Sequence, residues 1–110
     1  MSGASRTPVS ANPHRGEAQL LLDGVAHVLR PTFGALVAAE EELGPLFTLV
    51  ERASGGELKL GEMVALFWHC LAHPSGQSRE TFAEAVTRAG LAVCAPALRS
   101  LLVQVLKGGG

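Results

Sequence analysis

The dipeptide Asp23-Gly24 constrains the fold of this chain more than any other feature. It lies between two runs, 17–22 and 25–30, that are rich in Leu, Val and Ala. A two-residue turn of type I′ needs a positive φ at both central positions, and Asp-Gly adopts that conformation readily. The sequence therefore predicts an antiparallel β-hairpin over residues 17–30.

The turn also sets the register of the predicted hairpin, because side chains alternate between the two faces of a strand. One face is mostly apolar and pairs Leu22 with Val25, Leu20 with His27, and Ala18 with Leu29. The other face is half polar and pairs Glu17 with Arg30, Gln19 with Val28, and Leu21 with Ala26. The opposite charges at the open end favour this register.

After residue 30 the apolar residues recur at helical spacing, and the sequence predicts four to five short helices. Caps and breakers give their limits: 33–43 between Thr32 and Gly44, 45–53 from Pro45, 62–72 after Gly61, 79–89 between Ser78 and Gly90, and about 96–107 from Pro96. The helix over 62–72 is apolar almost all round, which predicts a central, largely buried position.

These elements indicate an α+β fold that is mostly α, with a two-stranded N-terminal β-hairpin followed by a small helical bundle. A length of 110 residues and a hydrophobic content of 47% suit one small domain. We expect this domain to span residues 14–107. Residues 1–13 show no hydrophobic period and are predicted to be a disordered leader, with 108–110 as a flexible glycine tail.

Composition argues against several classes of function. The formal net charge is −1 and the basic residues are dispersed, so we expect neither nucleic-acid nor membrane partners. No apolar run approaches the ~20 residues of a spanning helix, and the N-terminus lacks the apolar segment of a signal peptide. The cysteines Cys70 and Cys94 are too few for a disulfide framework, which favours a cytoplasmic location.

His69, Cys70 and His73 form the only metal-like cluster in the sequence. His69 and His73 share a helix face at positions i and i+4, which is a usable two-ligand geometry. However, the zincin motif has Glu at the position of Cys70, and no second Cys/His pair lies nearby to complete four ligands. We therefore predict packing roles for these residues and no metal site.

The other polar groups do not form a catalytic constellation. Cys94 has neither a base nor an electropositive neighbour in the sequence. Glu40, Glu41 and Glu42 are interpreted as the solvated face of a helix rather than an acid/base pair or a cation site. The sequence predicts no catalytic residue and no cofactor.

The last predicted helix offers a candidate partner interface. Its apolar positions cover more of the helix circumference than one core-facing stripe needs, and the candidates are Leu98, Leu102 and Val105. Trp68 is interpreted as a core residue that would join an interface only if exposed. Because the net charge is small, we expect recognition through apolar helix surface with little dependence on salt.

Several segments, in order, resemble the small tail assembly protein of gene transfer agents and related tailed phages. They are Arg15-Gly16-Glu17, Leu22-Asp23-Gly24, Leu29-Arg30-Pro31-Thr32-Phe33-Gly34-Ala35-Leu36, and Glu41-Glu42-Leu43-Gly44. The resemblance covers about residues 14–107 and is most specific in the hairpin and the helix that follows it. Members of this family are labelled both tail assembly chaperone and tail tube protein.

The resemblance implies a protein–protein role without catalytic residues. A tail assembly chaperone keeps the tape-measure protein soluble, brings tube subunits to it and is absent from the finished particle. The implied partners are tape-measure and tail tube proteins, while self-association stays open. One alternative is a structural tail tube subunit, although tube folds need a long β-sheet. Another is an unrelated small metal-binding or enzymatic protein built on His69, Cys70 and His73.

Overall fold

The hairpin forms where the sequence predicts it. The computed structural model describes residues 17–74 and 76–107. In it, β1 (Ala18–Leu22) pairs antiparallel with β2 (Val25–Leu29) in the predicted register. Asp23 and Gly24 both have a positive φ, of 51° and 79°, as a type I′ turn requires.

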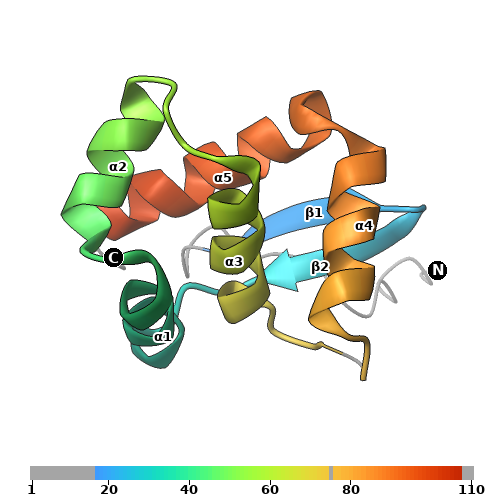
Figure 1. Cartoon of the computed structure of the whole chain (residues 1–110). Coiled ribbons are helices and arrows are strands. Elements are labelled where there is room, and N and C mark those ends of the chain that lie inside the picture. The colour runs from blue at the N-terminus through green and yellow to red at the C-terminus, as the bar shows by residue number, and fades with distance from the viewer. Residues whose placement is uncertain (1–16, 75, 108–110) are drawn as a thin grey trace, which may run out of the picture.

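Within the described residues, five helices follow the hairpin, and the fold is α+β and mostly α. They are α1 (Phe33–Leu43), α2 (Leu46–Ser54), α3 (Leu60–Cys70), α4 (Arg79–Ala89) and α5 (Leu91–Lys107). Figure 1 shows α3 at the centre of the molecule, with α1 and α2 to its left and α4 across the hairpin to its right. α5 runs behind α3 toward α2.

α1 and α4 have their predicted limits because capping residues define both ends. Thr32 and Ser78 each accept, through the side-chain hydroxyl, the backbone N–H three residues further on, both at 3.1 Å. Gly44 and Gly90 follow the last helical residues with φ values of 92° and 91°. This left-handed conformation ends a helix and favours glycine.

The start of α3 corrects the prediction, because the helix begins two residues earlier, at Leu60. Its N-cap is Lys59 and not Gly61. The carboxylate of Glu62 accepts the backbone N–H of Lys59 at 2.9 Å, which satisfies a donor that the helix itself cannot pair.

The end of α3 also comes two residues earlier than predicted, at Cys70, because the chain turns to pair with β2. Leu71 forms an isolated antiparallel bridge with Leu29. The N–H of Ala72 donates to the carbonyl of Val28 at 3.0 Å. This backbone pairing covers the edge of β2 that faces away from β1, so the hairpin is anchored to the end of the central helix.

α5 corrects the prediction by the largest margin, since it begins at Leu91 and contains Pro96 in its interior. The carbonyl of Gly90 accepts the N–H groups of Val93 and Cys94, each at 3.2 Å. Cys94 is buried and holds this first turn against the core. Pro96 lacks the N–H that would pair with the carbonyl four residues before it, but that carbonyl lies near the helix start, in an exposed turn. α2 differs by one residue, with Pro45 as its N-cap.

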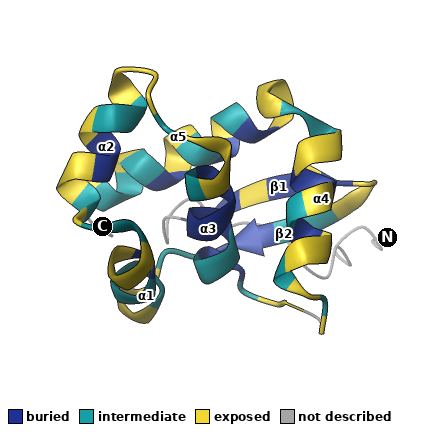
Figure 2. Cartoon of the chain, in the orientation of Figure 1, coloured by how far each residue is buried: buried dark blue, intermediate teal, exposed yellow. Residues whose placement is uncertain are grey.

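Side chains from the hairpin and from α1 to α5 form one hydrophobic core. Its largest fully buried members are Phe67, Phe82, Leu20, Leu22, Leu29, Leu49, Leu66 and Leu101. Phe82 of α4 contacts the rings of His27 and Trp68, with centroid distances of 6.2 and 5.8 Å. Figure 2 shows buried positions concentrated on α3 and the strands, so α3 has the central place that its apolar surface predicts.

Two ion pairs hold the ends of the hairpin. At the open end, Arg30 Nε donates to Glu17 Oε2 at 2.6 Å, which joins the pair of residues that the predicted register places opposite each other. At the turn, Arg88 of α4 donates to Asp23 Oδ2 at 2.7 Å. The hairpin is therefore tied to the helices at its turn as well as through its apolar face.

The predicted leader, residues 1–13, and the predicted glycine tail, residues 108–110, lie outside the described residues. Within residues 17–74 and 76–107, no single helix combines the length and hydropathy needed to span a membrane. α4 and α5 meet these criteria only as a pair, and the two helices bend by 113° at the break between them.

Candidate protein-binding groove

Two adjoining hollows lie along α5. One, of about 510 Å³, lies between α2 and the C-terminal half of α5. The other, of about 260 Å³, lies between the N-terminal half of α5 and the segment that connects α2 to α3. Ala53, Ala95 and Leu98 line both hollows, which therefore join into one continuous depression. We call it the α2–α5 groove.

α5 forms one wall of the groove because its apolar residues fall into two stripes. The first stripe, Cys94, Ala97 and Leu101, is buried in the core. The second recurs every three or four residues and lines the groove: Leu91, Ala95, Leu98, Leu102 and Leu106. A soluble helix that packs on only one side needs a single apolar stripe. Leu98 and Leu102 pack partly against the core, whereas Leu91 and Leu106 are exposed, so the second stripe keeps apolar surface that the core does not cover.

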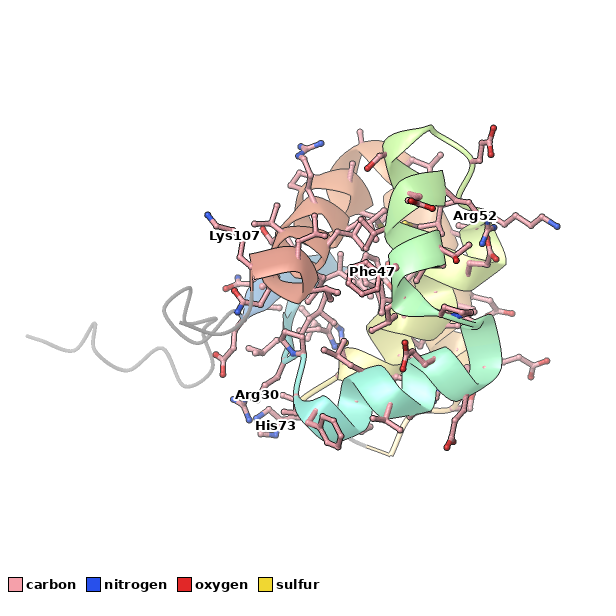
Figure 3. All side chains as sticks on the ribbon, turned by 90° about the vertical axis from the view of Figure 1, so that its left-hand side faces the viewer. Arg30, Phe47, Arg52, His73 and Lys107 are labelled. Carbon is pink, nitrogen blue, oxygen red and sulfur yellow. The ribbon has the colours of Figure 1, made fainter. Side chains whose placement is uncertain are left out.

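α2 and the segment after it form the opposite wall. This wall is made of Val50 and the small residues Ala53, Ser54 and Gly56. Because small side chains stand opposite the α5 stripe, the space between the two walls stays unfilled. Phe47, which is 79% exposed, adds apolar surface to α2. In the view of Figure 3 it lies between α2 and the C-terminal part of α5.

The charged side chains that line the groove are basic. They are Lys59 near one end and Arg99 on α5. Lys107 follows Leu106 at the end of α5 and is also exposed. No carboxylate lines either hollow. The groove thus combines an apolar floor with positive charge, although the chain as a whole has a formal net charge of −1.

The structure brings together part of the predicted interface. Leu98 and Leu102 line the groove, and both are half-buried. Val105 is half-buried on α5 but does not line either hollow. Trp68 is half-buried against Phe82, in the core that the sequence predicts for it, and away from the groove. The interface role of these residues stays a prediction.

The α2 wall is the part of the groove that sequence reasoning misses. Leu46, Leu49, Val50 and Ala53 lie on one side of α2, in the pattern of a helix that packs one apolar stripe on a core. Only Leu49 and Val50 are buried. A signal was present in Phe47, an apolar residue off that stripe, and in the small residues Ala53 and Ser54 at the end of the helix.

The acidic run of α1 has a structural role that the sequence analysis does not predict. Glu42 accepts hydrogen bonds from Arg79 of α4, with Nη1 at 2.9 Å from Oε1, and lies 2.8 Å from Nε2 of His69 on α3. It therefore links three helices and is not simply solvated. The hydrogen bonds from Arg79 and then His69 lower the pKa of Glu42 from 4.5 to about 2.

The residues of the metal-like cluster point to different neighbours. His69 meets Glu42, Cys70 is buried in the core, and His73 is exposed in the loop after α3. Burial raises the pKa of the Cys70 thiol to about 12, so this group is a poor nucleophile and a poor ligand at neutral pH. Burial also raises the pKa of Cys94. In the described part of the chain, no three His, Cys, Asp or Glu residues are grouped so as to hold a metal ion.

Comparison with known proteins gives one match. A family described as "Phage tail tube protein, GTA-gp10" matches residues 15–108. The match covers the hairpin and every helix from α1 to α5. No curated protein and no solved structure matches the chain. The family match concerns the whole fold and assigns no role to individual residues.

Proposed function

Because the chain belongs to the family of the phage tail tube protein GTA-gp10, we propose that it acts as a tail assembly chaperone. In this role it binds tape-measure and tail tube proteins in the bacterial cytoplasm while the tail is built. It catalyses no reaction and is absent from the finished particle. The observation that carries this proposal is the α2–α5 groove, an apolar depression that the described residues of the chain leave uncovered.

The physical basis of binding is the transfer of this apolar surface out of water. Leu91 and Leu106, at the two ends of the groove, are 66% and 58% exposed. Covering such side chains with a partner yields roughly 25 cal/mol for each Å² removed from water. Apolar patches of this kind on a small protein are typical of interaction sites. Because no covalent or metal-dependent step is involved, the contact can be reversible, as a chaperone requires.

A structural tail tube subunit is the second candidate, and the description of the family as a tail tube protein favours it. Such a subunit would need an extended sheet to close a ring with its neighbours. In the described residues the sheet consists of β1 and β2, with a single bridge at Leu71. The small size of this sheet favours the chaperone role over the tube role.

The decisive experiment is to follow the protein through assembly. An affinity-tagged chain is expressed in producing cells, captured before particle release, and its partners are identified by mass spectrometry. We expect the tape-measure protein in the captured material and no copies of the chain in purified particles. Stoichiometric copies in the particles would instead assign the tube role, and capture of neither tape-measure nor tube protein would contradict both roles.

Two variants of α5 test whether the groove makes the contact. Leu106 lines the groove, whereas Val93 is exposed on the same helix outside it. We expect Leu106→Asp to reduce capture of the partner by about 5- to 100-fold in affinity, as for an interface anchor. Val93→Asp should leave capture unchanged. Equal effects of the two variants would place the contact elsewhere on the molecule.

A further inference from the structure

Arg99 differs from the other arginines in the described part of the chain. Four arginines are each bound to a carboxylate of the chain: Arg30 to Glu17, Arg52 to Glu62, Arg79 to Glu42, and Arg88 to Asp23. No ion pair in residues 17–74 and 76–107 involves Arg99, and this residue lines the α2–α5 groove. Its guanidinium therefore presents donors to the groove without an acceptor from the described chain.

One lysine extends the same pattern along the groove. Lys59 lines its other end and takes part in no ion pair within the described residues. Arg99 and Lys59 thus add positive charge to an apolar lining that contains no carboxylate.

The dimensions and spacing of the groove fit a helix. Its α5 wall extends from Leu91 to Leu106, which is about 22 Å at a rise of 1.5 Å for each residue. The lining residues Leu91, Ala95, Leu98, Leu102 and Leu106 follow the three- and four-residue spacing of one helix face. A second helix lying alongside can insert its own side chains between these rows.

We infer that the α2–α5 groove binds an amphipathic helix of a partner protein, with an apolar stripe bordered by carboxylates. This inference rests on the proposed function, since it describes the partner that the same groove would hold. The apolar stripe covers the floor, and the carboxylates pair with Arg99 and Lys59. Charge complementarity of this kind selects and orients the partner, while the apolar contact supplies most of the affinity.

The inference refines the expectation that salt has little effect on binding. That expectation depended on the net charge of the whole chain, whereas the groove has its own local excess of positive charge. Exposed ion pairs are weak individually and are screened by salt. For an acidic-bordered helix we therefore expect a moderate loss of affinity, of about 3- to 10-fold, when the salt concentration rises from about 0.1 to about 0.5 M.

The test uses two labelled synthetic helices, each about 18 residues long so that it spans the groove. Both have the same leucine stripe, and they differ only in having Glu or Lys along its borders. Binding to the full-length chain is measured by fluorescence anisotropy. We expect the Glu-bordered peptide to bind at least about 10-fold more tightly than the Lys-bordered one, a difference of about 1.4 kcal/mol. Equal binding, preference for the Lys-bordered peptide, or binding of neither would overturn the inference.

Matched variants of the protein locate the effect. Arg99→Glu should abolish or reverse the preference for the Glu-bordered peptide. Ser100→Glu adds a carboxylate at the next residue, which is exposed but does not line the groove, and should change the preference little. Leu106→Asp should weaken binding of both peptides. Circular dichroism and thermal melting show whether each variant is folded, and a preference that survives in folded Arg99→Glu would contradict the assignment.

A second copy of this chain is the competing occupant, and sedimentation of the chain alone tests it. A dimer that Leu106→Asp dissociates would assign the groove to self-association and overturn the inference. The peptide assay also separates this inference from the proposed function. A chain that prefers the Glu-bordered peptide but captures no tail protein would keep the groove assignment and reject the chaperone role. A chain that captures the tape-measure protein but shows no preference for the Glu-bordered peptide would keep the chaperone role and reject the groove assignment.

Discussion

The hairpin and the α2–α5 groove differ in how many of their apolar side chains are buried and how many of their charged side chains have ion-pair partners within the chain. On the hairpin, Leu20, Leu22 and Leu29 are buried, although Leu21 and Val25 stay exposed, and the charges at both ends have partners within the chain. Along the groove, Leu91 and Leu106 stay exposed and Arg99 has no ion-pair partner in the described residues. Both regions are rich in apolar residues, so apolar content alone does not separate a core from a binding surface.

The contrast lies in what faces each apolar stripe. β1 packs against α4 and α5, and β2 is covered at its outer edge by Leu71 and Ala72. The second stripe of α5 faces the small residues Ala53 and Gly56, which leave space. A stripe that meets large side chains stabilises the fold, whereas a stripe that meets small ones remains available to a partner.

The same substitution on the two stripes of α5 should give the largest difference. Leu101 is fully buried, and we expect Leu101→Ala to lower the free energy of unfolding by about 2–5 kcal/mol, through lost burial and a cavity. Leu106→Ala, on the groove side, should change it by less than about 0.5 kcal/mol. Urea unfolding followed by circular dichroism measures both. Similar losses would show that the groove side is part of the core and would erase the contrast.

The contribution of the hairpin turn to stability can be tested by comparing the same substitution at Gly24, in the turn, and at Gly34, in α1. A Cβ atom at Gly24 or at Gly34 would meet nothing within 4 Å, but only Gly24 has a positive φ, of 79°. We expect Gly24→Val to lower stability by about 1–3 kcal/mol, because a β-branched residue resists that conformation. Gly34→Val should change stability by less than about 0.5 kcal/mol. An unaltered unfolding midpoint for Gly24→Val would remove the turn as the determinant of the hairpin.

The link that Glu42 makes between α1, α3 and α4 predicts a smaller and pH-dependent effect. Glu42→Gln should lower stability at pH 7 by about 0.2–1 kcal/mol, because the carboxylate is partly exposed and solvent screens the pair. Its pKa is lowered from 4.5 to about 2, so the stabilisation is complete above about pH 4.5 and disappears as the pH falls toward 2. Unfolding at several pH values should therefore show wild type and variant converging in acid.

Glu41→Gln is the matched control for this effect. Glu41 is exposed next to Glu42 on α1 and has no ion pair among the described residues. Its replacement removes the same charge without breaking the bonds to Arg79 and His69. If Glu41→Gln costs as much stability as Glu42→Gln, the effect belongs to the acidic patch as a whole and not to the link between helices.

The smallest effect is expected for the metal-like cluster. Replacing His69 and His73 together by Gln should leave partner binding unchanged and cost less stability than Glu42→Gln, because only the His69 part of the Glu42 link is lost. Protein purified without added metal should contain no stoichiometric zinc by elemental analysis. Zinc that is present in the wild type and lost in the double variant would instead establish a metal site.

Most of the fold can be predicted from the sequence because the relevant signals are local. The Asp23-Gly24 turn needs only two residues to define the hairpin and its register. The caps Thr32 and Ser78 and the glycines Gly44 and Gly90 define α1 and α4 in the same way. The prediction fails at the start of α5. Proline is common as the first residue of a helix, which favours a start at Pro96, but Gly90 already caps a helix that begins at Leu91. The early end of α3 is missed because Leu71 pairs with a strand that lies far away in the sequence.

The set of elements, the hairpin register and the family of the protein can be inferred from the amino-acid sequence, since each depends on neighbouring residues or on a pattern along the whole chain. The arrangement of the elements in space then decides which side chains remain exposed or without an ion-pair partner. Leu98, Leu101 and Leu102 are equivalent in an apolar helix until α2 is placed beside them. Likewise, the sequence does not show which arginines form ion pairs, because partners such as Glu42 and Arg79 come from elements that are distant in the sequence. The groove and its unpaired Arg99 therefore depend on how α2 and α5 are placed relative to each other.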